Sequence, residues 1–203
     1  MSVVATVAGV AVRVDEVDAA ERRLRGRRGA AALPAGGTAE GRQLRRWLTQ
    51  LIVTERVVAA EAQARGLSGR GAPGEEELLP DATARLELGS VTAAALADPR
   101  ARALFADVTA AIRVGDEEVA AYHARNPLRF AEPRRDSHGW RVPPTAGPPL
   151  DDVRSAIAGH LLGAARRRAF RVWLDARRAA LVRLAPGYEH PGDPRQPDNT
   201  HRH

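Results

Sequence analysis

Three histidines near the end of the chain, His190, His201 and His203, have side chains that can ligate a metal ion. Imidazole nitrogens suit zinc and other divalent first-row metals, and the carboxylates of Asp193 and Asp198 lie in the same segment. His201 and His203 are two positions apart, so an extended backbone would aim both at one side. The competing interpretation is a polar, proline-rich tail that is disordered. We expect no obligatory cofactor and keep a divalent metal at the tail as the alternative.

Three other residues are candidates for acid–base chemistry. Glu55 falls on the apolar stripe of a predicted long helix, where a carboxylate needs an arginine or backbone partner. A structural ion pair is favoured there over a general base. Tyr122 and His123 lie on a short predicted helix. We expect Tyr122 to pack against its neighbours and His123 to be exposed rather than catalytic.

The tryptophans are the residues expected to contact a ligand. Trp47 lies beside the apolar stripe of the long middle helix, and Trp173 lies on the predicted closing helix. Trp140 belongs to the segment D-S-H-G-W, which reads as a loop. A groove between the two helices, lined by the stems of arginines, would offer apolar area to a partner.

Common catalytic signatures are absent from the sequence. It holds no cysteine and no G-x-S-x-G elbow, and no G-x-G-x-x-G follows a predicted strand. All 31 basic residues are arginine, so a standard P-loop with its lysine cannot form. The sequence therefore leaves open whether the protein is an enzyme.

Composition limits the partners. The net charge is only +6 despite a pI of about 11.1, because arginine raises the pI without adding charge relative to lysine. No zinc-finger spacing or aromatic RNA-binding motif accompanies the arginines, so we expect no nucleic-acid partner. No apolar run approaches the ~18 residues of a membrane span, and the first residues lack the pattern of a signal peptide. We expect a cytoplasmic protein that does not enter membranes.

Periodicity predicts a mainly helical chain with a small sheet. Residues 3–14 read as a hairpin turning at Ala8-Gly9, and residues 181–184 read as a strand. Asp15, Asp98 and Asp116 are expected to cap the helices that follow them. The helical patterns cover residues 15–28, 42–65, 75–88, 91–97, 99–112, 117–125 and 150–180, and loops are expected at 29–41 and 134–149.

The segment V-G-D-E-E-V-A-A-Y-H-A-R-N-P-L-R-F-A-E-P, residues 114–133, resembles the part of SurA- and PrsA-type foldases that leads from the chaperone core to the parvulin prolyl-isomerase domain. Only residues 134–149 separate it from the closing helix, whereas an isomerase domain needs on the order of 90 residues. The resemblance implies a helical chaperone core over residues 1–186, with 134–149 in place of the isomerase and a polar tail at 187–203. It also implies that the last strand pairs with the N-terminal hairpin.

Three functions follow from this sequence. The resemblance implies non-catalytic, chaperone-like binding of a polypeptide or a small apolar ligand. The chain is also similar to small actinobacterial proteins of aromatic polyketide pathways that are often labelled acyl-carrier-protein malonyltransferase. No motif supports that activity, so the corresponding alternative is an accessory or tailoring enzyme whose site includes the tail. A homodimer that exchanges its hairpins is the third interpretation.

Overall fold

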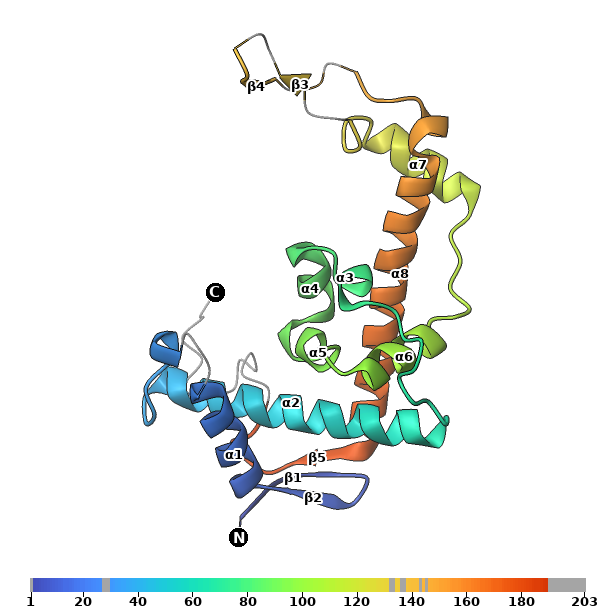
Figure 1. The fold of residues 1–203 in the computed structure, drawn as a ribbon. Coiled ribbons are helices and arrows are strands. Elements are labelled where there is room, and N and C mark those ends of the chain that lie inside the picture. The colour runs from blue at the N-terminus through green and yellow to red at the C-terminus, as the bar shows by residue number, and fades with distance from the viewer. Residues whose placement is uncertain are drawn as a thin grey trace. The chain divides into compact units, whose positions relative to one another are not determined.

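The computed structural model describes residues 2–26, 30–131, 134–135, 138–142, 144 and 146–189 (Figure 1). The chain divides into two compact units. Unit one comprises Met1–Val108 and Phe170–His203, and unit two comprises Thr109–Ala169. The fold is mainly helical with a small antiparallel sheet, as the periodicity predicts. None of the described helices combines the length and the apolar character that a membrane crossing needs.

Unit one contains the sheet and most of the helices. The long helix α8, Leu150–Leu181, contributes its residues 170–181 to this unit. The other elements are β1 (Val3–Val7), β2 (Val10–Arg13), α1 (Val14–Arg25), the 3-10 helix η1 (Ala30–Ala32), α2 (Ala39–Ala64), α3 (Glu75–Leu78), α4 (Ala82–Leu88), α5 (Ser90–Ala95), α6 (Pro99–Val108) and β5 (Val182–Leu184).

The sheet joins the two ends of unit one. Its strand order is β2-β1-β5, and both pairs are antiparallel. Ala5 of β1 faces Val12 on one side and Leu184 on the other. The turn between β1 and β2 is Ala8-Gly9, with positive φ at both residues, as a two-residue hairpin turn requires. The predicted pairing of the last strand with the N-terminal hairpin is therefore confirmed.

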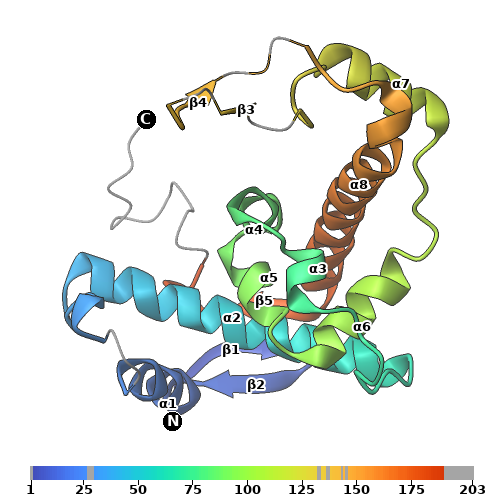
Figure 2. The ribbon, with the colours of Figure 1, turned by 45° about the horizontal axis from the view of Figure 1, so that its top comes forward.

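Helix α2 is the central element of unit one. It contacts β1 and α1, and it also contacts α5 and α6 (Figures 1 and 2). Its buried side chains Leu48, Val53 and Val57 join a core that includes Phe105 and Phe170. The helix begins where the side-chain oxygen of Thr38 accepts a hydrogen bond from the Gly41 N–H.

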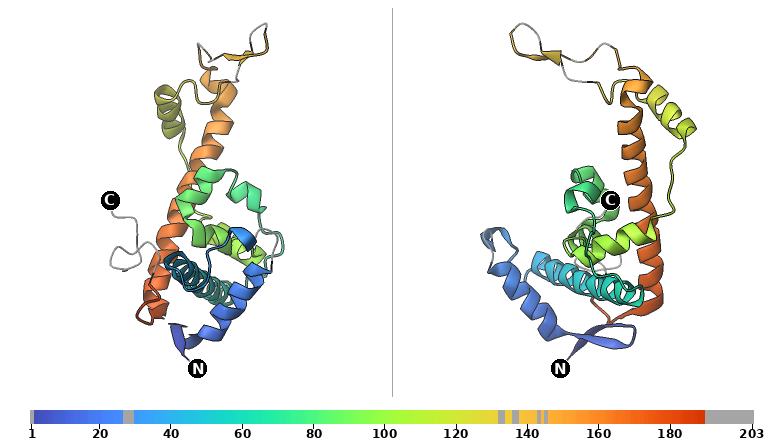
Figure 3. Two further views of the ribbon diagram at one scale, coloured as in Figure 1. Left: turned by 90° about the vertical axis from the view of Figure 1, so that its left-hand side faces the viewer. Right: turned by 45° about the vertical axis from the view of Figure 1, so that its right-hand side comes forward.

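Unit two has its own apolar core. It contains α7 (Asp116–Arg125), the short strands β3 (Arg134–Arg135) and β4 (Arg141–Val142), and residues 150–169 of α8. Val119 of α7 packs with Val153 and Ile157 of α8. Figure 3 shows α7 beside the first turns of α8 in two further views. Close packing also brings Gly147 against Pro127, so that a Cβ on Gly147 would lie 1.9 Å from the Pro127 carbonyl oxygen.

Two of the three predicted N-caps need correction. Helix α1 starts one residue before Asp15, and the N–H of its N-cap residue, Arg13, donates to Glu16 Oε1 at 2.9 Å. In the same way Gly115, not Asp116, is the N-cap of α7, with Glu118 accepting from its N–H at 3.0 Å. A glutamate at the third helical position can thus satisfy the first N–H without a polar cap.

Two longer segments also differ from the sequence prediction. The expected helix 75–88 is interrupted by Leu79-Pro80 and forms α3 and α4. The expected loop 134–149 includes the antiparallel pair β3–β4, in which Arg134 faces Val142. Two-residue strands are too short to show a period of two, so the sequence pattern does not reveal them.

Candidate functional site

A cavity of about 560 Å³ opens on the surface of unit one. We call it the charged cavity, because its lining carries both signs of charge above half-buried alanines and an isoleucine. Three secondary-structure elements and the residue that caps one of them supply its walls. The lining residues are Glu16, Ala19 and Arg23 of α1, Ile52, Glu55, Arg56 and Ala59 of α2, and Asp98 and Arg100 at the start of α6.

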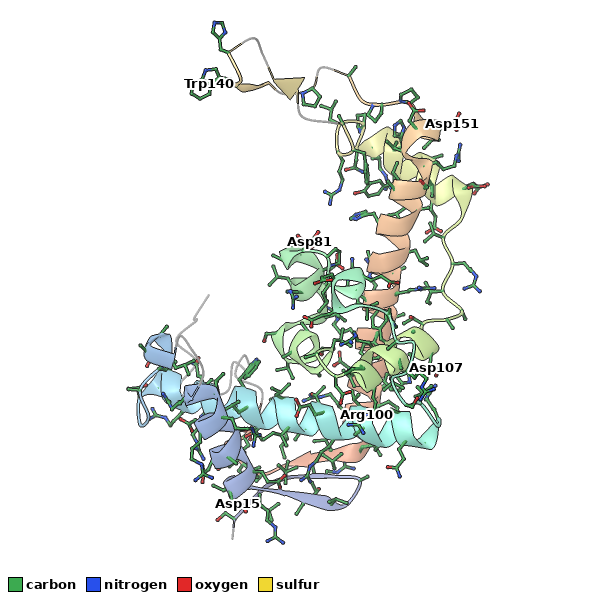
Figure 4. All side chains as sticks on the ribbon, in the orientation of Figure 1. Asp15, Asp81, Arg100, Asp107, Trp140 and Asp151 are labelled. Carbon is green, nitrogen blue, oxygen red and sulfur yellow. The ribbon has the colours of Figure 1, made fainter. Side chains whose placement is uncertain are left out.

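The helical repeat explains why these residues share one space. On α2 the lining positions are 52, 55, 56 and 59, and on α1 they are 16, 19 and 23. Side chains separated by three or four positions lie on one face of a helix. The third wall is set by Asp98, whose Oδ1 accepts from the Arg100 N–H at 2.8 Å and caps α6. Figure 4 labels Arg100 beside α2.

Two charge pairs are formed within the lining. Arg56 Nη2 lies 2.5 Å from Glu16 Oε2, and Arg56 Nη1 donates to the Ala11 carbonyl of β2 at 2.7 Å. Arg100 Nη2 lies 3.1 Å from Asp98 Oδ2. Partial burial works to raise the pKa of Asp98, but its hydrogen bonds from Arg100 outweigh this and hold that pKa below its usual value. Asp98 is therefore a stably ionised carboxylate.

Glu55 differs from the other carboxylates of the charged cavity. It is exposed, and within the described residues it makes no hydrogen bond or ion pair. Neighbouring atoms nevertheless exclude part of its water, and this burial raises the pKa of its carboxyl group. The charge of Arg23 opposes the rise, and the charge of Asp98 adds to it. Among the residues that the structure describes, Glu55 thus lacks the expected structural ion pair, because its side chain faces the cavity instead of the core.

A second, smaller cavity of about 310 Å³ lies in unit two. Tyr122 lines it, and the Tyr122 hydroxyl is 3.2 Å from His160 Nε2. The rings of Tyr122, His160 and Phe130 also pack edge-on or tilted against one another. His123 Nε2 donates to the Pro148 carbonyl at 2.9 Å. Both residues that we considered as catalytic candidates here therefore make contacts that stabilise the fold.

The three tryptophans lie outside both cavities. Trp47 Nε1 donates to Ser90 Oγ at 3.0 Å, so its polar edge is satisfied within unit one. Trp173 stacks on Phe170 with ring centroids 5.6 Å apart, and the Arg65 guanidinium lies 5.5 Å from its ring. Trp140 belongs to unit two and is 74% exposed (Figure 4). Within unit one, Trp47 and Trp173 both pack against the apolar core and do not line a described cavity.

The predicted metal ligands His190, His201 and His203 lie outside the described residues. Within the described part of the chain, no group of three or more histidines, aspartates or glutamates could hold a metal ion. The first residues of the tail are fixed to α2, because Arg46 Nε donates to Gly187 O at 3.0 Å and Gln50 Nε2 donates to Tyr188 O at 2.8 Å. The metal site and the tail-dependent accessory enzyme both stay predictions.

Among the residues that line the charged cavity, the sequence indicated Glu55 as a candidate but none of the other charged residues. Arg23, Arg56 and Arg100 were not singled out, because they are three of 31 arginines and nothing local distinguishes them. One signal was available for α2. Residues 52, 55, 56 and 59 are three or four positions apart, so they share one face of a helix and combine charged and apolar side chains there.

Comparison with known proteins gives one match. The model of a family described as a family of unknown function (DUF7158) matches residues 3–40. The matched residues run from β1 through α1 to the start of α2, and they include the α1 wall of the charged cavity. No curated protein and no solved structure matches the chain.

Proposed function

We propose that this protein binds a polypeptide segment without chemical conversion, as a chaperone does, and that the charged cavity is the binding site. The observation that carries the proposal is the composition of the lining. Ala19, Ile52 and Ala59 supply apolar surface, and three carboxylates and three guanidinium groups surround it. Unfolded polypeptide presents apolar, cationic and anionic groups next to one another, and this lining complements all three.

The size and chemistry of the charged cavity fit binding better than catalysis. A volume of about 560 Å³ accommodates a few side chains of a bound segment. The lining residues are carboxylates, guanidinium groups and aliphatic side chains, with no hydroxyl or imidazole among them. Burial raises the pKa of Glu55, but a base needs a positioned reaction partner before it is catalytic.

The fold gives further support. A SurA/PrsA-type chaperone core is expected to be helical and to pair its final strand with the N-terminal hairpin, and the described structure has both features. The resemblance to that class is itself part of the proposal. A cytoplasmic location is also part of it, and fractionation of the native cells tests that location.

The experiment measures binding of a fluorescent, permanently unfolded polypeptide by anisotropy. Ala59→Phe places a ring in the charged cavity, whereas Ala60→Phe adds the same ring at the neighbouring exposed position of α2. We expect the wild-type chain and Ala60→Phe to bind equally, and Ala59→Phe to bind at least several-fold more weakly. Circular dichroism establishes that both variants fold. No binding by the wild-type chain, or equal binding by both folded variants, would contradict the proposal.

A further inference from the structure

Among the residues that the structure describes, one cation and one anion of the charged cavity make no hydrogen bond or ion pair. Of its six charged residues, Glu16 pairs with Arg56 and Asp98 pairs with Arg100. The remaining two are Arg23 of α1 and Glu55 of α2. Neither makes a hydrogen bond or an ion pair within the described residues, although both line the same cavity. The described lining residues therefore carry equal numbers of positive and negative charges, and two of these charges, of opposite sign, have no bonded partner among the described residues.

The charges of Arg23 and Glu55 interact electrostatically, although no hydrogen bond or ion pair joins the two side chains. Arg23 acts on the carboxyl group of Glu55 through space, and the backbones that hold the two residues belong to different helices. Both side chains are exposed, so each can turn toward a group that enters the cavity. A direct ion pair between an exposed arginine and an exposed glutamate would cost both side chains solvation and rotamer freedom, and its net gain in water is small. A ligand that carries both charges satisfies the two groups at once.

We propose that the charged cavity selects a ligand with a cationic group beside an anionic group, and that Glu55 receives the cation while Arg23 receives the anion. This inference rests on the proposed function, because it specifies what the same site recognises. In an extended polypeptide, a basic and an acidic residue two positions apart point to the same side, about 7 Å from each other. A free zwitterionic dipeptide offers the same chemistry from a second source.

The test uses the full chain and four matched peptides with the central sequences Lys-Ala-Glu, Lys-Ala-Gln, Gln-Ala-Glu and Gln-Ala-Gln in one apolar host. We expect Lys-Ala-Glu to bind most tightly, and each lost charge to weaken binding about two- to fivefold, as for partly exposed ion pairs. Glu55→Gln removes the advantage of the lysine alone. Arg23→Gln removes the advantage of the glutamate alone.

Two control variants change the same charges outside the lining. Arg22→Gln neutralises the neighbouring exposed arginine of α1, and Glu40→Gln neutralises an exposed glutamate of α2. Both controls are expected to keep the full ranking of the four peptides. An equal effect of Arg22→Gln and Arg23→Gln overturns the proposal, because the ranking of the four peptides would then depend on the net charge of the protein and not on the cavity.

A pH series and a competitor complete the experiment. The groups that surround Glu55 are Glu16 and Arg23 on α1, Arg56 on α2, and Asp98 and Arg100 at α6. The lysine advantage depends on ionised Glu55, so it is lost as the pH falls through the raised pKa of Glu55, while Asp98 is still ionised.

Displacement of the peptide by free Lys-Glu assigns the site to small zwitterions, and failure of displacement assigns it to polypeptide. Equal binding of all four peptides overturns this inference and leaves the proposed function standing, whereas no binding of any peptide overturns the proposed function.

Discussion

Glu55 is the residue whose environment departs most from its sequence expectation. It lies on an exposed position of α2, yet partial burial and the nearby Asp98 raise the pKa of its carboxyl group. A folded-state pKa above the unfolded one means that the folded chain binds the proton more tightly. Ionised Glu55 therefore opposes folding at neutral pH, and its protonation at lower pH removes that opposition.

Replacing Glu55 with glutamine should accordingly stabilise the protein at neutral pH. The gain should be small, because the side chain keeps much of its solvation. It should shrink as the pH falls through the raised pKa and vanish below the usual pKa of glutamate, where both variants are neutral in both states. Urea unfolding of Glu55→Gln and of the wild-type chain at a series of pH values measures this. A gain that persists undiminished at the lowest pH would contradict the pKa direction.

At the scale of elements, the periodicity of apolar residues predicted the structure correctly wherever a long helix has one apolar face. It predicted α2, α8 and the return strand β5, because the spacing of Leu, Val and Ile follows from the geometry of each element. It failed at the caps of α1 and α7, where Glu16 and Glu118 satisfy the first N–H. Periodicity also does not predict the charged cavity, because Arg23, Glu55 and Asp98 come from three separate segments of the sequence that form its walls only in the folded protein.

Two glycines of unit two provide a matched pair of substitutions. A Cβ on Gly147 would lie 1.9 Å from the Pro127 carbonyl, whereas a Cβ on Gly159 in α8 meets nothing within 4 Å. Gly147→Ala should therefore destabilise unit two by about 1–3 kcal/mol, as overpacking does. Gly159→Ala should stabilise it by about 0.5–1 kcal/mol, through helix propensity. Hydrogen exchange of α7 amides reports both effects, and equal protection in the two variants would contradict the packing described here.

The hairpin is expected to be indispensable to unit one. Deleting residues 1–12 removes Val4, Val7 and Val12, each no more than 4% exposed. Their combined burial contributes about 5 kcal/mol or more, which is comparable to the stability of a whole domain. We expect the truncated chain to lose its cooperative thermal transition and much of its helicity. Val10→Ser, at a 63% exposed position of the same hairpin, should keep both. A normal melting curve for the deletion would contradict the role of the sheet.

At the scale of the molecule, the proposed resemblance to SurA- and PrsA-type chaperone cores assigns residues 134–149 to the position at which those proteins carry their isomerase domain. Sixteen residues cannot enclose a second core of that size. We expect the protein to leave the cis–trans relaxation of a proline peptide at its uncatalysed rate, over tens to hundreds of seconds. A prolyl-isomerase of known activity provides the positive control, and acceleration by this protein in proportion to its concentration would contradict the prediction.

The tail is tested best by a cut after Glu189, because Gly187 and Tyr188 are bonded to α2. We expect the shortened chain to keep its melting temperature and to share with the full chain a lack of response to zinc and nickel. A metal site at His190, His201 and His203 would act differently. It would raise the melting temperature of the full chain alone, reversibly with a chelator, and would weaken below pH ~6.5 as the imidazoles take up protons.

The placement of β1 between β2 and β5 also determines when unit one can be completed during synthesis. Ala5 pairs with Leu184, so the sheet cannot close until all residues up to 184 have left the ribosome. Unit two, by contrast, is one continuous stretch, Thr109–Ala169, and all of its core residues emerge earlier. Until β5 arrives, β1 keeps one edge open to pairing with a neighbouring chain. Newly made protein should therefore depend more on protection from aggregation before its residue 184 emerges than after it.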